Sequence, residues 1–395
     1  MKILLINKFH YVKGGADRHY LELGENLAKQ GHQINYFSMH DVHNQYCEDE
    51  KYFVDDMDIA EVKTGKNIIK TVIRMFYHRQ AQKNLQKMID QQKPDVAHLH
   101  NIYHHLSPSI INTLKKNDIP IVMTIHDYYL YSPVYSLYLD NQVFDPQVKK
   151  YWWIIKKKAI KNSLLASILA CLIHRLHRTI YQKIDCFICP SQFMANYIKR
   201  TYPQARVEVI ANFTKIIETE DNIKGNYYLY AGRIIEEKGV ALVLAAAERW
   251  PEYQFHLAGS GPDEEHYRQQ YDLPNIVWRG QLSGEQLQTE IKQARACLVP
   301  SLWYENCSLG ILESFALGTP VIASKMGGNA ELVIDGQNGL LFNHQQVNSL
   351  LAAIQKIEKS TALQQRLNAG ALASAQNYTF EKFYPKLMAV YESLL

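Results

Sequence analysis

Short apolar runs alternate along the chain with longer segments in which apolar residues recur every three or four positions. The short runs are typical of strands buried on both faces of a parallel sheet, and the longer segments are typical of helices that cover such a sheet. Residues 16–30 show the helical pattern, which Gly31 ends. The expected strands form two series, which are Ile3–Ile6, Gln33–Phe37, Val96–His98, Ile121–Ile125, Cys186–Cys189 and Val207–Ile210, and then Tyr228–Ala231, Gln254–Ala258, Ile276–Trp278, Ala296–Val299, Pro320–Ala323 and Gly339–Phe342.

Two successive series of alternating strands and helices predict an α/β chain with two Rossmann-like parallel-sheet domains. A polar stretch after Phe213 indicates a linker, so we expect a first domain at 1–213 and a second at 214–378. Residues 379–395 predict one more amphipathic helix, which we expect to cross back and pack on the first domain. Ligands of parallel sheets bind at the carboxyl ends of the strands, so two facing domains would form a cleft.

Glu305 and Glu313 flank the expected start of a helix near Ser308, which follows the predicted strand Ala296–Val299. A helix N-terminus attracts phosphate through its unpaired backbone N–H groups, here those of 306–310. A carboxylate on each side can accept hydrogen bonds from the hydroxyls of a ribose or a hexose. The arrangement suits a nucleotide-sugar, although the spacing alone fits one surface glutamate and one helical glutamate better.

Glycine-rich loops follow several of the predicted strands, at Gly14-Gly15, 232–239, Gly259 to Gly261, and Gly327-Gly328. Glycine lets the backbone adopt positive φ and approach a ligand closely, although each of these loops also fits an ordinary turn. In the second loop, Arg233 and Lys238 could converge on a diphosphate; the alternative is a solvated loop with internal Glu–Lys pairing. Neither a G-x-G-x-x-G fingerprint nor a Walker loop is present.

Composition narrows the function classes. A length of 395 residues with 47% hydrophobic residues fits two domains with real cores, and a net charge of +4 is too mild for a typical nucleic-acid binder. Six cysteines in a chain of this length are not a disulfide framework. The N-terminus reads as a buried strand, not as a signal peptide, and no apolar run approaches the ~20 residues that cross a bilayer. We therefore expect a cytoplasmic protein.

A basic segment at 146–184 stands out because it contains no Asp or Glu. It combines Tyr151-Trp152-Trp153 and the apolar run Leu164–Ile173 with nine basic residues. One interpretation is a helix that lies in the interface of an anionic membrane, which would make the protein peripheral on the inner face of the plasma membrane. The other is a helical insert packed on the first domain, and the composition leans towards the membrane.

Three patterns could suggest a metal, and we favour other interpretations of each. Asp56-Met57-Asp58 spells the D-x-D of metal-dependent sugar transferases, but it lies in a variable acidic stretch that fits a solvated loop. Cys186 and Cys189 are three apart on a predicted strand, so their side chains face opposite sides. His98, His100, His104 and His105 fit histidines that line a cleft or support the fold. We expect no catalytic metal.

Together, these motifs resemble glycosyltransferase family 4, a large group of retaining enzymes with the GT-B fold. The resemblance is specific in the second domain, where G-R-x-x-x-E-K-G, L-x-G-x-G-P, E-x7-E and G-G-x-x-E occur in the family's order at 232–239, 257–262, 305–313 and 327–331. It is looser in the first domain, at Gly14-Gly15, 98–101, His126-Asp127 and Pro190-Ser191. The chain departs from many members at Ala330, where they have proline, and at Ala211-Asn212-Phe213, where they have Pro-Asn-Gly.

The resemblance implies a role for each matched residue. Arg233 and Lys238 would hold the donor diphosphate, Glu305 would bind hydroxyls of the donor sugar, His126 would lie beside the sugar, and Glu313 would bind the ribose. The expected donor-binding residues are Gly14, Gly15, Gly232, Gly259, Gly261, Asn306, Cys307, Ser308, Leu309 and Glu313. The expected acceptor-side residues are His100, Asn101 and Asp127.

The function implied is a retaining, metal-independent hexosyl transfer from a nucleotide-sugar to a glycan acceptor in surface polysaccharide biosynthesis. A lipid-linked acceptor, common in the family, would explain the basic segment. No cofactor and no nucleic-acid partner are expected. Two alternatives stay open: a nucleotide-sugar epimerase on the same fold, which would need the donor alone, and a membrane-associated scaffold without activity.

Overall fold

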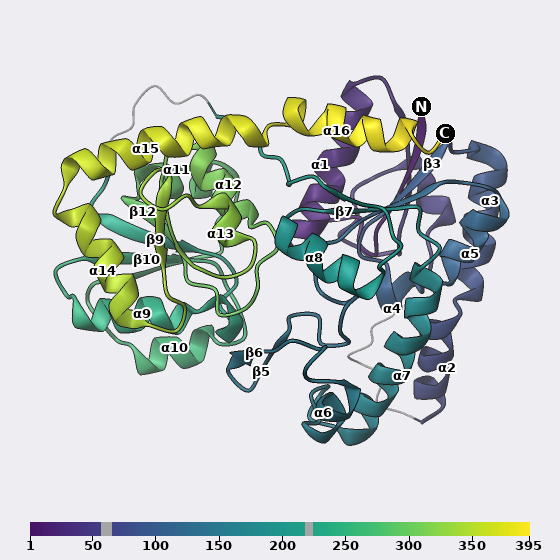
Figure 1. The fold of residues 1–395 in the computed structure, drawn as a ribbon, viewed down its shortest axis with the longest axis horizontal. Coiled ribbons are helices and arrows are strands. Elements are labelled where there is room, and N and C mark those ends of the chain that lie inside the picture. Colours follow the sequence, from purple (N-terminus) through teal and green to yellow (C-terminus); the bar gives the residue numbers. More distant parts are fainter. Residues whose placement is uncertain (57–64, 218–223) are drawn as a thin grey trace. The chain divides into compact units, whose positions relative to one another are not determined.

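The twelve strands predicted from the apolar runs are all present in the computed structural model, with ends that differ by at most two residues. The structure describes residues 1–56, 65–217 and 224–395, with the backbone alone for 65–70. The chain folds into two compact units (Figure 1). The first unit comprises 1–136, 145–210 and 384–395, and the second comprises 137–144 and 211–383.

The first unit is built on a sheet of six parallel strands in the order β2-β1-β3-β4-β7-β8. These strands are β1 (Lys2–Ile6), β2 (Gln33–Phe37), β3 (Val96–Leu99), β4 (Ile121–Thr124), β7 (Cys186–Cys189) and β8 (Val207–Val209). The helical elements in the sequence of this unit are α1 (Gly15–Lys29), η1 (Glu48–Tyr52), α2 (Gly65–Phe76), α3 (Arg79–Gln92), α4 (Tyr103–Leu106), α5 (Ser109–Lys116), α6 (Tyr151–Lys156), α7 (Leu164–Tyr181) and α8 (Gln192–Thr201). Every residue of β3, β4 and β7 is buried, as expected for strands covered on both faces.

The second unit repeats this plan with a parallel sheet in the order β11-β10-β9-β12-β13-β14. Its strands are β9 (Tyr227–Ala231), β10 (Gln254–Ala258), β11 (Ile276–Gly280), β12 (Ala296–Val299), β13 (Val321–Ser324) and β14 (Gly339–Phe342). Its helical elements are η2 (Glu236–Lys238), α9 (Val240–Arg249), α10 (Glu264–Gln270), α11 (Gly284–Gln293), α12 (Leu309–Ala316), α13 (Asn329–Leu332), α14 (Val347–Glu358), α15 (Thr361–Ala375) and η3 (Gln376–Tyr378).

Each sheet has a point at which the strand order reverses. The chain moves outward from β1 to β2 and then returns to the other side of β1 with β3. It likewise moves from β9 through β10 to β11 and returns beside β9 with β12. Loops that leave neighbouring strands at such a point diverge, and ligands bind in the space between them. The candidate residues are therefore expected at the carboxyl ends of β1 and β3 and of β9 and β12.

A hairpin that the sequence did not predict joins the second unit, although the chain before and after it belongs to the first. It consists of β5 (Tyr138–Leu139) and β6 (Gln142–Val143), joined by Asp140 and Asn141, whose φ angles are 52° and 59°. Positive φ at both central residues is typical of the tight turns that join such strands. Hydrogen bonds tie the hairpin to its unit, from the Tyr138 hydroxyl to Glu236 (3.0 Å) and from the Gln345 amide to the Asn141 carbonyl (2.8 Å).

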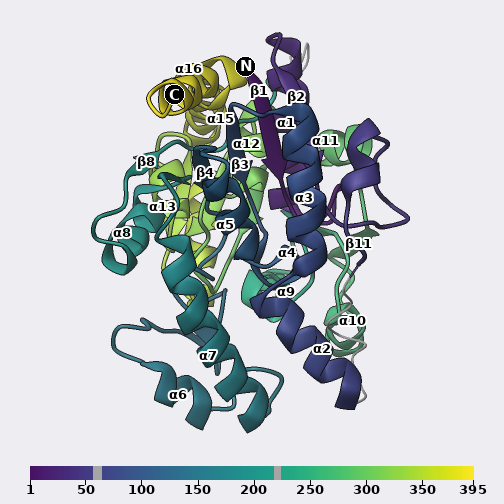
Figure 2. The same cartoon turned by 90° about the vertical axis from the view of Figure 1, so that its right-hand side faces the viewer.

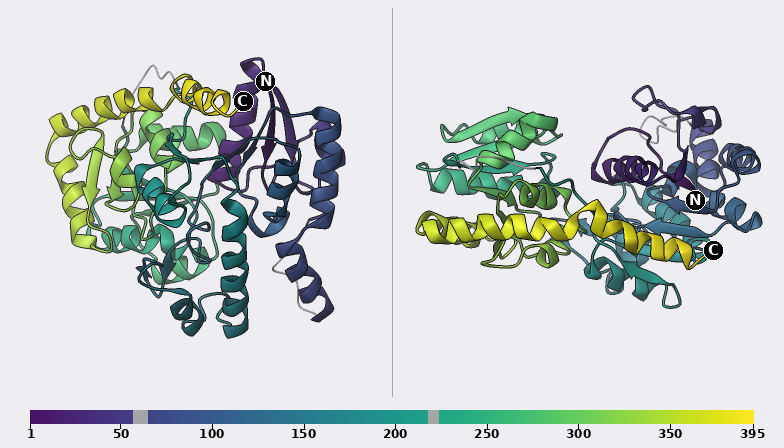
Figure 3. Two further views of the ribbon diagram at one scale, coloured as in Figure 1. Left: turned by 45° about the vertical axis from the view of Figure 1, so that its right-hand side comes forward. Right: turned by 90° about the horizontal axis from the view of Figure 1, so that it is seen from above.

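The C-terminal helix α16 (Phe380–Glu392) follows η3, and the chain passes from the second unit to the first within it, between Phe383 and Tyr384 (Figure 3). The prediction that this helix packs on the first domain is confirmed. The buried Tyr391 hydroxyl lies 2.6 Å from Nδ1 of His98 on β3, and the Tyr384 hydroxyl lies 2.9 Å from Nε2 of His32.

We predict that Tyr391→Phe lowers the free energy of unfolding of the first unit by about 1–3 kcal/mol, because it leaves a buried imidazole nitrogen without its partner. Urea unfolding followed by tyrosine and tryptophan fluorescence measures the effect. Tyr46→Phe is the control, since Tyr46 is 87% exposed and should leave the transition unchanged. Equal stability of the two variants would contradict the prediction.

Candidate active site

A buried carboxylate marks the switch point of the second unit. Glu305 follows β12 and is only 8% exposed. Its Oε1 accepts three hydrogen bonds, from Nζ of Lys238 (2.6 Å), Oγ of Ser301 (2.8 Å) and Nε1 of Trp303 (2.8 Å). The Lys238 ammonium also lies 5.0 Å from the centre of the Trp303 ring. Lys238 comes from the loop after β9, so the ion pair joins the two loops that diverge at this point.

Opposing effects act on the pKa of Glu305. Burial raises it, but the charge of Lys238 and the hydrogen bonds from Lys238, Trp303 and Ser301 together lower it below its ordinary value. Glu305 is therefore an ionised carboxylate at neutral pH, able to accept hydrogen bonds but not to act as an acid. The described residues provide no hydrogen-bond partner for its second oxygen, Oε2.

The loop after β9 is fixed by backbone contacts. The Tyr230 hydroxyl donates to the Arg233 carbonyl (2.5 Å), and the Ile234 amide donates to the Ser260 carbonyl (2.9 Å). A further hydrogen bond, from the Leu302 amide to the Glu237 carbonyl (2.8 Å), ties this loop to the turn that carries Glu305. The Arg233 side chain is exposed at the strand end. Lys238 thus pairs with Glu305. The alternative interpretation, in which Lys238 pairs with a glutamate of its own loop, is wrong.

Two glycines after β10 allow the loops after β9 and β10 to touch. A Cβ at Gly259, where φ is +139°, would lie 1.9 Å from the Gly232 carbonyl oxygen, and a Cβ at Gly261 would lie 2.1 Å from that of Ile234. Gly327, where φ is +54°, packs in the same way against the backbone of Glu305, since its Cβ would lie 2.4 Å from that carbonyl oxygen. At these three positions glycine is required because the backbone of a neighbouring loop leaves no room for a Cβ. The sequence pattern did not predict these contacts between loops.

Helix α12 begins beside this cluster. The predicted start near Ser308 is confirmed, since Ser308 is the N-cap residue of α12, and Glu313 lies half-buried inside the helix. The first N–H groups of a helix have no partner within it, so they are available to an anion. Asn306 and Cys307 precede the cap, and the Asn212 side chain donates to the Cys307 carbonyl (3.2 Å). Burial raises the pKa of the Cys307 thiol to about 12, which keeps it neutral and unreactive.

A stack of histidines occupies the corresponding edge of the first unit. The rings of His98 and His100 lie 4.6 Å apart and those of His100 and His126 lie 5.2 Å apart, with interplanar angles of 21° and 17°. Nδ1 of His100 and Nε2 of His126 are within hydrogen-bond distance (2.9 Å). Burial, together with the neighbouring His19 and His98, lowers the pKa of His126 well below its ordinary value. The imidazole of His126 is therefore uncharged at neutral pH.

Polar residues beside the stack form a second network. Asp127 accepts hydrogen bonds from the Tyr103 hydroxyl (2.8 Å) and the Tyr129 amide (2.9 Å), and burial raises its pKa. The Asn101 amide donates to the Asn7 side chain (3.1 Å), which in turn donates to the buried Asp17 (2.9 Å). Asn7 and Asp17 were not predicted as site residues, although Asn7 directly follows β1 and Asp17 lies in the first turn of α1, two positions at which ligand-binding side chains are expected.

Gly14 and Gly15 lie at the start of α1, and neither adopts the positive φ that glycine permits. Gly14 has an extended backbone with φ of −162°, which any residue can adopt, and neither glycine lies in the left-handed region. The nearest atom to a Cβ at Gly14 would be an Asp17 carboxylate oxygen at 3.9 Å. Both glycines are exposed, so the backbone itself does not require them.

Two family models together span residues 13–373. "Glycosyltransferase Family 4" matches 13–216, and "Glycosyl transferases group 1" matches 212–373. The chain belongs to glycosyltransferase family 4. An uncharacterized glycosyltransferase of Methanocaldococcus jannaschii is 24% identical over all of this chain and 99% of its own length. A phosphatidyl-myo-inositol mannosyltransferase of Mycolicibacterium smegmatis is 22% identical over all of this chain and 94% of its own length.

Solved structures share the fold of this family 4 chain. A sucrose-phosphate synthase from Thermosynechococcus elongatus superposes with a TM-score of 0.72 at 21% identity and covers all of this chain and 98% of its own. The Anabaena protein HepE in complex with UDP-glucose superposes with a TM-score of 0.66 at 15% identity, over the whole of both chains. The GT-B expectation is thereby confirmed.

Other candidates lie apart from these strand ends. Met57 and Asp58 of the D-x-D pattern lie outside the described residues, and Cys186 and Cys189 are free and buried on β7. In the described ranges, no group of three or more His, Cys, Asp or Glu could hold a metal ion.

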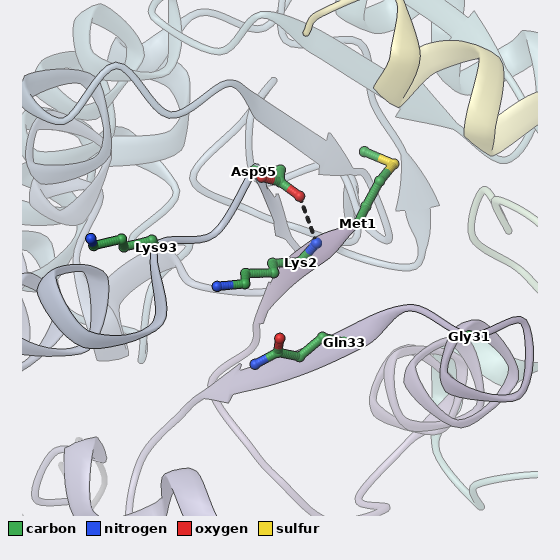
Figure 4. Close-up of a pocket in the computed structure, with 6 residues that line it drawn as sticks. All are labelled: Met1, Lys2, Gly31, Gln33, Lys93 and Asp95. Carbon is green, nitrogen blue, oxygen red and sulfur yellow. Dashed lines mark hydrogen bonds between the residues drawn. The ribbon is translucent and has the colours of Figure 1, made fainter.

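A hollow of about 330 Å³ (Figure 4) lies at the opposite, amino-terminal edge of the first sheet. It is lined by Met1, Lys2, Gly31, Gln33, Lys93 and Asp95.

We predict that Gly261→Ala destabilises the second unit by about 1–3 kcal/mol, because the added methyl group would clash with the Ile234 carbonyl. Differential scanning calorimetry would show this as a lower Tm. Gly310→Ala is the matched control, since its methyl group would meet only the Ser308 side chain at 3.8 Å and alanine favours a helix. A Tm for Gly261→Ala at or above that of the control would refute the role given to this glycine.

Proposed function

We propose that this family 4 protein transfers a hexosyl group from a nucleotide-sugar to a glycan acceptor with retention of configuration, and that it needs no metal or cofactor. The observation that carries the proposal is the buried, ionised Glu305, held by Lys238 at the point where the strand order of the second sheet reverses. Such a site combines cations, a carboxylate and a helix start, which are the groups that recognise a diphosphate linked to a sugar.

The donor diphosphate would be bound by Arg233 and Lys238. An ammonium has three donors, so Lys238 can keep its bond to Glu305 and still reach a phosphate oxygen. The exposed guanidinium of Arg233 is a planar fork that matches phosphate geometry. Both charges would act most strongly as the nucleoside diphosphate departs, because negative charge develops on its phosphate oxygens at that moment.

Glu305 would orient the donor sugar. Its Oε1 is occupied by three donors, so Oε2 is the atom that would accept sugar hydroxyls. The lowered pKa keeps this acceptor ionised throughout the neutral range. Glu313 would accept the ribose hydroxyls, and the N–H groups at the start of α12 would face the phosphates.

Residues of the first unit would serve the acceptor and the reacting sugar. His126 is uncharged, so it would act as a hydrogen-bond partner of the sugar and not as a cation. Asp127, oriented by Tyr103, would meet an acceptor hydroxyl, with His100 and Asn101 beside it. Gly14 and Gly15 would lie beside the donor phosphates, and the missing Cβ of Gly14 would leave space there, since the nearest atom to it would be an Asp17 carboxylate oxygen at 3.9 Å.

In the proposed reaction, the bond between the anomeric carbon and the phosphate oxygen breaks, and the acceptor oxygen bonds to the same face of that carbon. The acceptor proton goes to the departing phosphate oxygen, so no additional base is required. The protein would contribute mainly position and electrostatic stabilisation.

A surface glycan carried on a lipid is the acceptor class that we propose. One relative, aligned with the whole of this chain, is named for mannosyl transfer to phosphatidyl-myo-inositol. The alternatives are a nucleotide-sugar epimerase and an inactive scaffold. The intact set of Arg233, Lys238 and Glu305 argues against the scaffold, and incubation with donor alone separates the epimerase, because only an epimerase would convert the sugar without an acceptor.

We predict that Arg233→Ala lowers kcat on the order of 10²–10³-fold, the usual effect of removing one group that stabilises developing negative charge. The assay is release of the nucleoside diphosphate from a nucleotide-hexose in the presence of a membrane glycolipid extract, with the base of the donor chosen by a thermal-shift screen of UDP, GDP and ADP. Arg366→Ala is the control, as an exposed arginine on α15 of the same unit. Equal rates for Arg233→Ala and the control, with both folded, would sink the assignment of this residue.

We also predict that EDTA leaves the rate of transfer unchanged, because protein cations would neutralise the diphosphate. The rate is measured with and without EDTA, and again after Mg²⁺ or Mn²⁺ is restored. Activity that EDTA abolishes and a divalent ion restores would contradict the metal-independent reaction while leaving the glycosyl transfer itself standing.

A further inference from the structure

Helix α7 exposes a continuous stripe of aliphatic side chains, made of Leu164, Leu165, Ile168, Leu172 and Leu176, which we call the α7 stripe. Each is at least 44% exposed, and Leu165 is 76% exposed. Leu164 and Leu165 are adjacent, and intervals of three or four residues from Leu165 onward place the others on the same face of the helix. The buried face of α7 mixes polar side chains, such as Ser167, His174 and His177, with the apolar Ile173. A contiguous apolar surface of this kind marks an interaction site.

The charge around the stripe has one sign. Residues 146–184 contain nine basic and no acidic residues. Trp152 on the neighbouring α6 is 61% exposed, and Val148 just before it is 73% exposed. Figure 2 shows α6 and α7 together at one end of the first unit, beyond the sheet. In the described part of the chain, no helix is both long enough and apolar enough to cross a membrane.

A cationic pocket of about 400 Å³ lies beside these helices. Its lining includes Lys149 and Lys150 before α6, Arg178 of α7, and Arg200 of α8. Asp145 offsets part of this charge, 3.5 Å from Arg200, and Arg178 donates to the Thr201 carbonyl at 3.2 Å. Both lysines are exposed at the rim. Four basic side chains thus line one cavity, and such side chains are the donors that a phosphate group requires.

We propose that the α7 stripe and this pocket form a docking surface for a bilayer that contains anionic phospholipids. The aliphatic side chains enter the edge of the hydrocarbon region, and the pocket receives a headgroup phosphate. Apolar side chains flanked by lysine, arginine and tryptophan are what a helix lying in a membrane interface requires. This docking does not depend on the transfer reaction.

Charge distinguishes the anionic bilayer from two other possible partners of this surface, which are a second copy of the chain and a nucleic acid. A symmetric pair formed by two copies of the stripe would bring two basic segments together, and their repulsion opposes the contact. A nucleic acid would satisfy the cations but would leave the leucines in water. An anionic bilayer satisfies both features.

The test is co-sedimentation of the full chain with vesicles of phosphatidylcholine alone or with about 30% phosphatidylglycerol. We expect pelleting with the anionic vesicles only, weakened by salt. Lys149→Gln with Lys150→Gln should weaken partitioning by on the order of tenfold, given the attraction of each lysine to an anionic surface. Leu165→Gln with Leu172→Gln should weaken it at least as much, because two aliphatic side chains would no longer leave water.

Two matched controls use exposed side chains elsewhere: Lys356→Gln with Lys359→Gln, and Val42→Gln with Ile334→Gln. Both should pellet like the unaltered protein, and unchanged Tm values show that all variants are folded. The proposal is overturned if the anionic vesicles do not pellet the chain, or if the stripe variant binds as the controls do. It is equally overturned if the stripe mediates self-association without lipid, or if the pocket binds soluble glycerol phosphate while vesicles bind nothing.

Discussion

A carboxylate removed from water has to be matched by positive charge and hydrogen-bond donors, and Glu305 imposes this requirement on the second unit. Lys238 supplies the charge from the loop after β9, while Ser301 and Trp303 supply donors from the turn after β12. Because the two partners of the ion pair are 67 residues apart, the pair holds together the loops at the switch point of the sheet. Gly239 follows from the same requirement, since a Cβ at this position would lie 2.0 Å from the Pro300 carbonyl oxygen, where the loops after β9 and β12 meet.

The two units differ in the charge of the side chains at the carboxyl ends of their strands. The second concentrates charge at its strand ends, as a partner of a diphosphate would. The first places uncharged imidazoles there, and burial lowers the pKa of His100 and His126 so that they stay neutral. The C-terminal helix supports this arrangement through Tyr391 and His98. Uncharged imidazoles offer directional hydrogen bonds, whereas protonated ones would attract any anion.

The strands were predictable because those buried on both faces appear as contiguous apolar runs. The hairpin was not, since strands of two residues, such as Tyr138–Leu139, produce no periodic pattern. The motifs identified Lys238 and Glu305 separately, but Glu236 and Glu237 were equally plausible partners for Lys238 until the fold was known. Gly14 shows a further limit, because a glycine permits positive φ without adopting it. The basic segment was evident from composition, whereas the pocket required the packing of α6, α7 and α8.

The chain passes between the two units at 136/137, 144/145, 210/211 and 383/384. No single cut in the gene therefore yields two self-sufficient halves. A fragment that ends at residue 210 would retain the hairpin without the residues that it contacts. It would also lose the terminal helix, and with it the buried contact between Tyr391 and His98. Chimaeras that exchange the second unit between related proteins must carry the hairpin along and leave the residues after 383 behind, so simple recombination of this unit is restricted in a chain of this design.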